Sequence, residues 1–184
     1  MSKISKIRFK GYSEEVRRKL LKQLVKLDGR IGFRGYTKQD IVERSNGVLA
    51  YSPTNILNNK IVNGKNDTYI SQAKYEESPE IMVKKNNILF VKTGSTLGKS
   101  SIVRELTEPA TINPQLIVIK TIHVDSDYLG VYLLTDNIQK QIFQAKIGGA
   151  VPTLTETEIG KFVISLPSLA EQSAIGSLFR TLDD

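Results

Sequence analysis

The sequence predicts an α+β domain in which a twisted, mixed or antiparallel β-sheet is flanked by peripheral helices. Short apolar runs bounded by Asn, Gly and Pro recur through the middle of the chain, which is typical of strands separated by turns. Apolar residues spaced three and four positions apart occur towards both ends, which is typical of amphipathic helices. With 184 residues, 40% of them hydrophobic, the chain is long enough for one domain with a substantial core.

The first predicted element is a helix over residues 13–27. Ser13 is a suitable N-cap residue, acidic residues follow it in the first turn, and Gly29 would end the helix. The side chains expected on its buried face are Val16, Leu20, Leu21, Leu24 and Val25.

Residues 30–124 are expected to form most of the sheet. Short strands are predicted over residues 47–52 and 67–71, with a helical turn near residues 39–44. Residues 81–104 predict a β-hairpin, in which a glycine-containing turn joins two apolar strands. A further strand is predicted over residues 115–124, an apolar run that includes the histidine.

The last third of the sequence predicts a helix, a strand and a second helix. Apolar residues recur at helical spacing through residues 127–145, and a short apolar strand follows over residues 161–166. Pro167 ends this strand, Ser168 is a suitable N-cap residue, and Glu171 three positions later completes a capping box.

The final helix carries one apolar stripe, with residues at positions i, i+3, i+4 and i+7. These residues are Ile175, Leu178, Phe179 and Leu182. Leaving such side chains exposed forfeits ~1.5–3 kcal/mol of burial for each, so the stripe is predicted to contact a partner surface. That surface is either the rest of its own domain or another protein chain.

Positive charge is concentrated at the N-terminal end. The formal net charge is +7, and residues 1–38 hold 12 of the 26 basic residues but 3 of the 19 acidic ones. A basic helix face is often merely solvated, whereas beside a DNA-binding loop it would supply sequence-independent attraction to phosphates. The residues concerned are Arg17, Arg18, Lys19, Lys22 and Lys26.

The composition excludes several kinds of site. With no cysteine, the chain has no disulfide, no thiolate metal site and no cysteine nucleophile. His123 is the single histidine, so neither a histidine-based zinc site nor a catalytic pair is expected. No apolar run approaches the ~20 residues of a membrane-spanning helix, and no signal-peptide pattern follows Met1. These observations predict a soluble cytoplasmic protein that is not an enzyme.

The segment GSTLGKS at residues 94–100 resembles a phosphate-binding P-loop but is one residue too short between its glycines. A P-loop also leads into a helix, whereas the residues that follow here predict a strand. The segment is therefore expected to be a hairpin turn in which Gly94 and Gly98 adopt positive φ. Its polar side chains would either lie along DNA or serve only the turn.

Four segments carry a family resemblance: GRIGFRGYTKQDI (29–41), VKKNNILFVKTGSTLGKSSIV (83–103), INPQLIVI (112–119) and VISLPSLAEQSAIGSLFRTLD (163–183). In this order they resemble the target-recognition domain of the DNA-specificity subunit of type I restriction–modification systems. The resemblance covers nearly the whole chain. The family's subunit usually carries two such domains and two long helices, so the sequence is expected to be an engineered fragment or a natural half-subunit.

The resemblance implies a DNA target-recognition domain over residues 1–167, followed at residues 168–184 by the truncated start of a long conserved helix. Such a domain would read one half of a bipartite site on double-stranded DNA and dock methyltransferase subunits. A restriction and translocase subunit would complete the complex. The S-adenosylmethionine, ATP and Mg²⁺ of the system would be bound by those partners and not by this chain. The helix stripe offers the chain a route to self-association.

DNA-contacting residues are expected in three polar loops. Around residue 55, amide and hydroxyl side chains are typical of groups that read base edges. The hairpin turn and the glycine turn after residue 145 would offer lysines and short donors to phosphates. The candidates are Tyr51, Thr54, Asn55, Asn58, Lys92, Thr93, Ser95, Thr96, Lys99 and Lys146.

Two other functions fit the sequence. A protein-interaction module without DNA contact would use the stripe of the final helix alone. A phosphate- or RNA-binding protein would use the loop at residues 94–100, which fits the composition but not the P-loop spacing.

Overall fold

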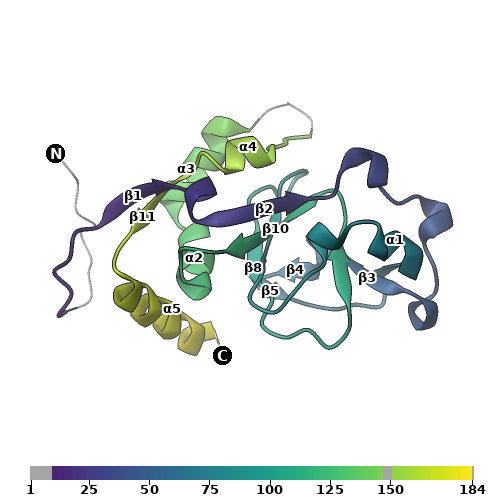
Figure 1. Cartoon of the computed structure of the whole chain (residues 1–184), viewed down its shortest axis with the longest axis horizontal. Helices are drawn as coiled ribbons and strands as arrows, with labels where there is room; N and C mark the ends of the chain where they lie inside the picture. Colours follow the sequence, from purple (N-terminus) through teal and green to yellow (C-terminus); the bar gives the residue numbers. More distant parts are fainter. Residues whose placement is uncertain (1–9, 147–150, 184) are drawn as a thin grey trace.

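The computed structural model describes residues 10–146 and 151–183 and confirms the α+β class. Instead of one sheet, the described residues form a four-stranded sheet, a three-stranded sheet and two two-stranded ribbons. Figure 1 shows the four-stranded sheet near the centre, with α2, α3 and α5 towards one end of the molecule and β3 towards the other.

The central sheet is antiparallel throughout. Its order is β2 (Val25–Gly29), β10 (Leu116–Thr121), β7 (Ile88–Val91) and β8 (Ser100–Ile102). Because successive side chains alternate between faces, Ile117 and Ile119 enter one core, whereas Leu116 and Val118 enter a second. Both faces of the sheet are therefore buried, which explains the continuous apolar runs of the two inner strands, β7 and β10, in the sequence.

The second core lies between the central sheet and the three-stranded sheet. In the latter, β3 (Val48–Tyr51) is antiparallel to β6 (Thr68–Ile70) and parallel to β9 (Ala110–Ile112). The strands predicted over residues 47–52 and 67–71 are thus confirmed. The strand predicted over residues 115–124 is shorter than expected, because β10 ends at Thr121 and His123 lies beyond it, exposed.

Short helical turns connect these strands. The turn predicted near residues 39–44 is divided into two 3₁₀ turns, η3 (Lys38–Asp40) and η4 (Arg44–Asn46). The other short elements are η2 (Gly32–Arg34), η5 (Pro53–Asn55), α1 (Gln72–Glu76), η6 (Pro79–Ile81) and α4 (Glu156–Ile159).

The helix predicted over residues 13–27 is wrong. The described residues form β1 (Arg17–Leu20), the 3₁₀ turn η1 (Leu21–Gln23) and β2. β1 pairs with β11 (Val163–Leu166), and β2 pairs with β10. Leu21, Leu24 and Val25 are buried in the first core, so long-range strand pairing prevails over the local helical pattern.

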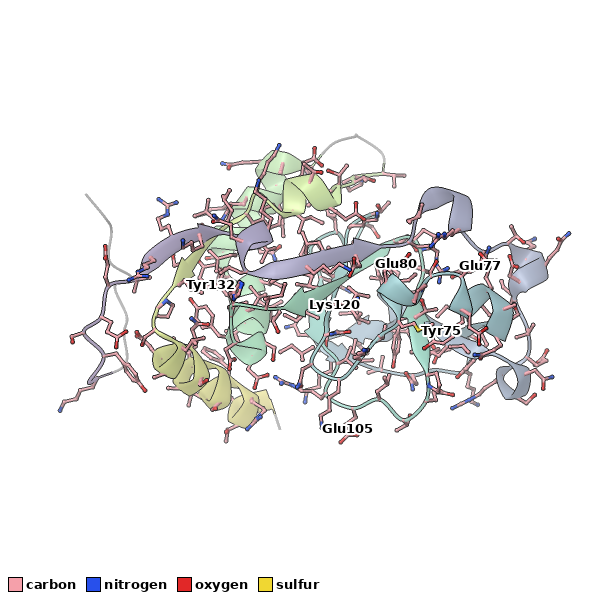
Figure 2. All side chains as sticks on the ribbon, viewed as in Figure 1. Tyr75, Glu77, Glu80, Glu105, Lys120 and Tyr132 are labelled. Carbon is pink, nitrogen blue, oxygen red and sulfur yellow. The ribbon has the colours of Figure 1, made fainter. Side chains whose placement is uncertain are left out.

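The helix predicted over residues 127–145 is interrupted. It consists of α2 (Ser126–Leu133) and α3 (Asp136–Ala145). At the break, the Thr135 hydroxyl donates to the backbone carbonyl of Tyr132 at 2.7 Å. Tyr132, labelled in Figure 2, also joins α2 to β11, because its hydroxyl accepts a hydrogen bond from the backbone N–H of Ser165 at 3.0 Å.

Candidate nucleic-acid interface

The turn between β7 and β8, residues 92–99, is closed by its own backbone. The N–H of Leu97 donates to the carbonyl of Gly94 at 3.1 Å, and the N–H of Lys99 donates to the carbonyl of Thr96 at 3.1 Å. The turn leads into strand β8 and not into a helix. It therefore lacks the helix N-terminus that a P-loop directs at phosphate.

Two glycines shape the 92–99 turn, as predicted. Gly94 and Gly98 have φ angles of 111° and 90°, a region in which side chains are disfavoured. Gly98 is also confined by packing, because a Cβ at this position would lie 2.9 Å from Cδ1 of Ile142. Ile142 belongs to α3, so the turn packs directly against that helix.

The segment after α3 is held against the same turn. The N–H of Gly94 donates to the carbonyl of Pro152 at 3.0 Å. Thr93 and Thr153 form an antiparallel bridge, and their hydroxyl oxygens are 3.3 Å apart. The 92–99 turn, the segment 151–154 and the end of α3 thus form one surface, which we call the loop surface. Of the glycine turn predicted from Lys146 onwards, residues 147–150 lie outside the described residues.

The loop surface displays several of the predicted side chains. Ser95 and Lys99 are exposed, Thr96 is half-buried, and Lys146 is exposed at the end of α3. The Lys146 ammonium lies 4.2 Å from the centroid of the Phe143 ring, and Phe143 is 70% exposed. The sequence pattern gives no sign of this role, because the apolar spacing predicts Phe143 on the apolar face of one unbroken helix. An exposed ring beside a lysine offers both a stacking face and a positive charge.

Lys92 is a less suitable phosphate contact than predicted. Its Nζ lies 2.7 Å from Oε1 of Glu156, and its side chain is 16% exposed. The two residues are 64 positions apart in the sequence, so no local pattern could reveal the ion pair. The Glu156 carboxylate therefore already neutralises the Lys92 ammonium, which would otherwise be available to a phosphate.

Tyr51 and Asn55 are buried, each 3% exposed, and so do not suit the predicted role of base contacts. The Asn55 amide oxygen accepts a hydrogen bond from the Ser52 N–H at 2.9 Å. Its amide nitrogen donates to the Val62 carbonyl at 3.0 Å and to Oδ1 of Asp67 at 2.7 Å. Burial raises the pKa of Tyr51, so its phenol is neutral. Both side chains serve the fold.

Thr54 and Asn58 remain exposed. The Thr54 hydroxyl lies 2.7 Å from Oγ of Ser52. Asn58 and Asn59 have φ angles of 49° and 60° and form the two-residue turn that joins β4 (Ile56–Leu57) to β5 (Lys60–Ile61). Two successive positive φ angles are typical of a type I′ hairpin, in which Asn is favoured. Asn58 is therefore displayed at the tip of a hairpin.

The basic residues expected on a helix face lie instead on β1, η1 and β2. All five, Arg17, Arg18, Lys19, Lys22 and Lys26, are exposed. Because neighbouring residues of a strand point to opposite faces, those on β1 do not form a single basic stripe. Lys26 is moreover paired with Asp28, with Nζ 3.2 Å from Oδ1.

The final helix, α5 (Leu169–Asp183), packs against α2 of its own domain. Figure 1 shows the two helices side by side. A Cβ at Gly176 would lie 2.6 Å from the Cβ of Asp127 and 2.9 Å from the N of Tyr128. Ile175 is partly buried and packs against the first core, so this part of the stripe contacts its own domain, which is one of the two surfaces expected for it.

The rest of the predicted stripe stays on the surface. Leu178, Phe179 and Leu182 are 44%, 41% and 70% exposed. Three large apolar side chains on one helix thus face away from the domain and are available to a partner.

The start of α5 is not capped as predicted. Oγ of Ser168 is buried and has no hydrogen-bond partner in the described part of the chain. The helix is anchored instead by Gln172, whose side-chain oxygen accepts from the Asp125 N–H at 3.0 Å. The side-chain nitrogen of Gln172 donates to the Pro167 carbonyl at 2.8 Å. Docking on α2 therefore decides how α5 begins.

Residues 10–146 and 151–183 contain neither a candidate metal site nor a candidate membrane-spanning helix. No group of three His, Asp or Glu side chains there is arranged to hold a metal ion. None of the helices in these ranges combines the length and apolar character needed to cross a membrane.

Comparisons with known proteins agree with one another. The sequence model of the protein family described as type I restriction modification DNA specificity domain matches residues 15–184 of this chain. The specificity subunit of the type I restriction enzyme MjaVIII from Methanocaldococcus jannaschii is 22% identical over 122 residues, which is 64% of this chain and 29% of that protein. The chain therefore spans less than a third of this relative.

Two solved structures share the fold. The S subunit of the type I restriction-modification system from M. genitalium matches with a TM-score of 0.62 at 14% identity, over 92% of this chain and 39% of that chain. The HsdS subunit from Thermoanaerobacter tengcongensis matches with a TM-score of 0.66 at 13% identity, over 95% of this chain and 39% of that chain.

Proposed function

Because the chain belongs to the family of type I restriction modification DNA specificity domains, we propose that it binds double-stranded DNA and reads one half of a bipartite target. The loop surface is the observation that supports this proposal. It joins the 92–99 turn, which carries Lys99, Ser95 and Thr96, to the segment 151–154 and to α3, after which Lys146 follows.

The polar residues divide between two roles. Lysines contact phosphates and position a protein on the duplex, whereas amides and hydroxyls read base edges. Lys99 and Lys146 suit the first role. Thr54 and Asn58, together with Ser95 and Thr96, suit the second, because all four keep at least part of the side chain accessible.

Salt-dependent DNA binding tests the proposal. Fluorescence anisotropy with a mixture of random duplexes should show binding whose log K falls linearly with log [NaCl], with a slope of about −0.9 for each phosphate contacted. The linear fall is expected because bound lysines release the counterions condensed on DNA. Affinity that is undetectable at 50 mM NaCl, or that does not change with salt, would contradict a phosphate-binding role.

We also propose the division of labour that the family suggests. The chain would dock methyltransferase subunits, with a restriction and translocase subunit completing the assembly, and those partners would bind S-adenosylmethionine, ATP and Mg²⁺. The chain itself would carry out no catalysis. ATP hydrolysis by the isolated chain that is lost in Lys99→Ala would contradict this division and favour the alternative phosphate- or RNA-binding role of the 94–100 loop.

A protein-interaction module is the second candidate, and the exposed side chains of Leu178, Phe179 and Leu182 favour it. A stable coiled coil needs an apolar repeat sustained over three to four heptads, and this stripe is shorter. The chain is therefore expected to be monomeric at micromolar concentration. Sedimentation velocity at increasing concentration measures this. A tight dimer that dissociates in Phe179→Ser and Leu182→Ser would make self-association a principal function of the helix.

A further inference from the structure

A cavity of about 380 Å³ is lined by none of the residues proposed above to contact DNA, although Ser100 in its wall directly follows the 92–99 turn. It is bounded by the edge strand β8, the β4–β5 hairpin, α2 and Arg180 of α5. The hairpin is tied to the strand by Ser101, whose hydroxyl donates to the Asn59 carbonyl at 2.7 Å. Four separate parts of the chain therefore define its walls.

The strand side of the cavity offers unused hydrogen-bonding groups. Val91 donates to the carbonyl of Lys99, and Val103 donates to the carbonyl of Asn87. In an antiparallel pair, residues that bond to the partner strand alternate with residues whose backbone groups point the other way, so next to Lys99 the N–H of Ser100 points out of the sheet edge. Oγ of Ser100 is also buried and has no partner among the described residues, although Ser100 lines the cavity.

The cavity mouth is positively charged. Arg104 forms an ion pair with Oδ1 of Asp127, and Nη1 of Arg180 lies 3.6 Å from Oδ2 of the same carboxylate. Two guanidinium groups thus share one carboxylate and retain both a net positive charge and free donor positions. Their side chains are 41% and 55% exposed, so an anion from solvent can reach them.

The remaining walls are mixed, with Asn59, Lys60 and Asn63 from the hairpin side and an apolar part from β8 and α2. Ile102 lines one side, and Val131 of α2 and Leu134, which follows that helix, line another. Glu105 also borders the cavity; Figure 2 shows it at the lower edge of the molecule, on the connection that follows β8. Its carboxylate would repel a ligand that carries several charges.

We propose that this cavity binds a small amphipathic anion, with one phosphate or carboxylate group on an aromatic or aliphatic body no larger than a mononucleotide. The charged group contacts Arg104 and Arg180, and the body lies against Ile102 and Val131. Ser100 supplies the buried donor. A volume of about 380 Å³ is at the lower end of ligand pockets, and charge-assisted bonds beside an apolar wall are the usual way such pockets orient a ligand.

Adenosine 5′-monophosphate (AMP) is a suitable probe, with adenosine and inorganic phosphate as its two halves. In ¹H–¹⁵N NMR titrations of the full chain, AMP should shift the amides of Ser100, Ile102 and Val131 in a saturable manner. Adenosine and phosphate should each bind at least roughly tenfold more weakly, because each lacks one half of the recognition. Non-saturable shifts, or shifts confined to the 92–99 turn, would overturn the proposal.

Matched variants locate the site. Arg180→Gln should weaken AMP binding roughly tenfold, whereas Arg17→Gln, the same change on exposed β1, should leave it unchanged. Ser100→Ala should weaken AMP binding while preserving the fold, since the hydroxyl it removes is unpaired among the described residues. A random DNA duplex should not displace AMP. Equal AMP affinity in wild type, Arg180→Gln and Ser100→Ala, or displacement of AMP by the duplex, would contradict a separate small-anion site.

Discussion

Replacing Gly176 with leucine is expected to lower the free energy of unfolding by about 2 kcal/mol. A Cβ at this position would lie 2.6 Å from the Cβ of Asp127 and 3.1 Å from Oδ1 of Asp125, so the added side chain must push α5 away from α2. Overpacking of this kind costs ~1–3 kcal/mol, and displacing the helix also exposes the apolar area that Ile175 buries. The better helix propensity of leucine offsets ~0.8 kcal/mol at most.

Urea denaturation followed by circular dichroism measures this destabilisation. The matched control is Ser177→Leu, which adds a leucine to an exposed position of the same helix and should change stability by less than about 0.5 kcal/mol. If Gly176→Leu and Ser177→Leu unfold at the same urea concentration, α5 does not pack against α2 through this glycine.

The double variant Lys99→Ala/Lys146→Ala is expected to bind duplex DNA roughly a hundredfold more weakly at low salt, about tenfold for each lysine. Both lysines are exposed on the loop surface, where each is placed to neutralise one phosphate. The magnitude of the salt slope should fall by about 1 for each phosphate that the variant no longer neutralises. Because phosphates carry no base identity, the weakening should be similar for all sequences.

Anisotropy titrations at several NaCl concentrations measure both the affinity and the slope. The control is Lys84→Ala/Lys85→Ala, which removes the same charge from exposed residues at the other end of β7. Thermal unfolding establishes that both double variants remain folded. If the two variants bind DNA equally weakly, attraction by net charge explains the binding, and the loop surface is not the DNA-binding face.

The two mispredicted helices show where local pattern fails. Residues 13–27 have helical apolar spacing, yet β1 pairs with β11 and β2 with β10. Arg17 and Leu166 are opposite each other in this register, although they lie at opposite ends of the sequence. In the helix predicted over residues 127–145, α2 and α3 follow the predicted apolar periodicity. The break at Leu134–Thr135, however, turns the apolar face of α3 relative to that of α2 and leaves Phe143 exposed.

The family, the α+β class, three of the four strands of the central sheet and the glycine turn between two of them could all be predicted from the sequence, whereas β2 could not. These features depend on the order of motifs and on local chemistry, such as strands buried on both faces and glycines at positive φ. Which polar residues are available for binding follows only from the folded structure. Asn55 bonds to Asp67 and Lys92 to Glu156, and such pairings depend on chain segments that meet only when the core has formed. For the same reason, Ile175 is partly buried against the first core while Leu178, Phe179 and Leu182 stay exposed.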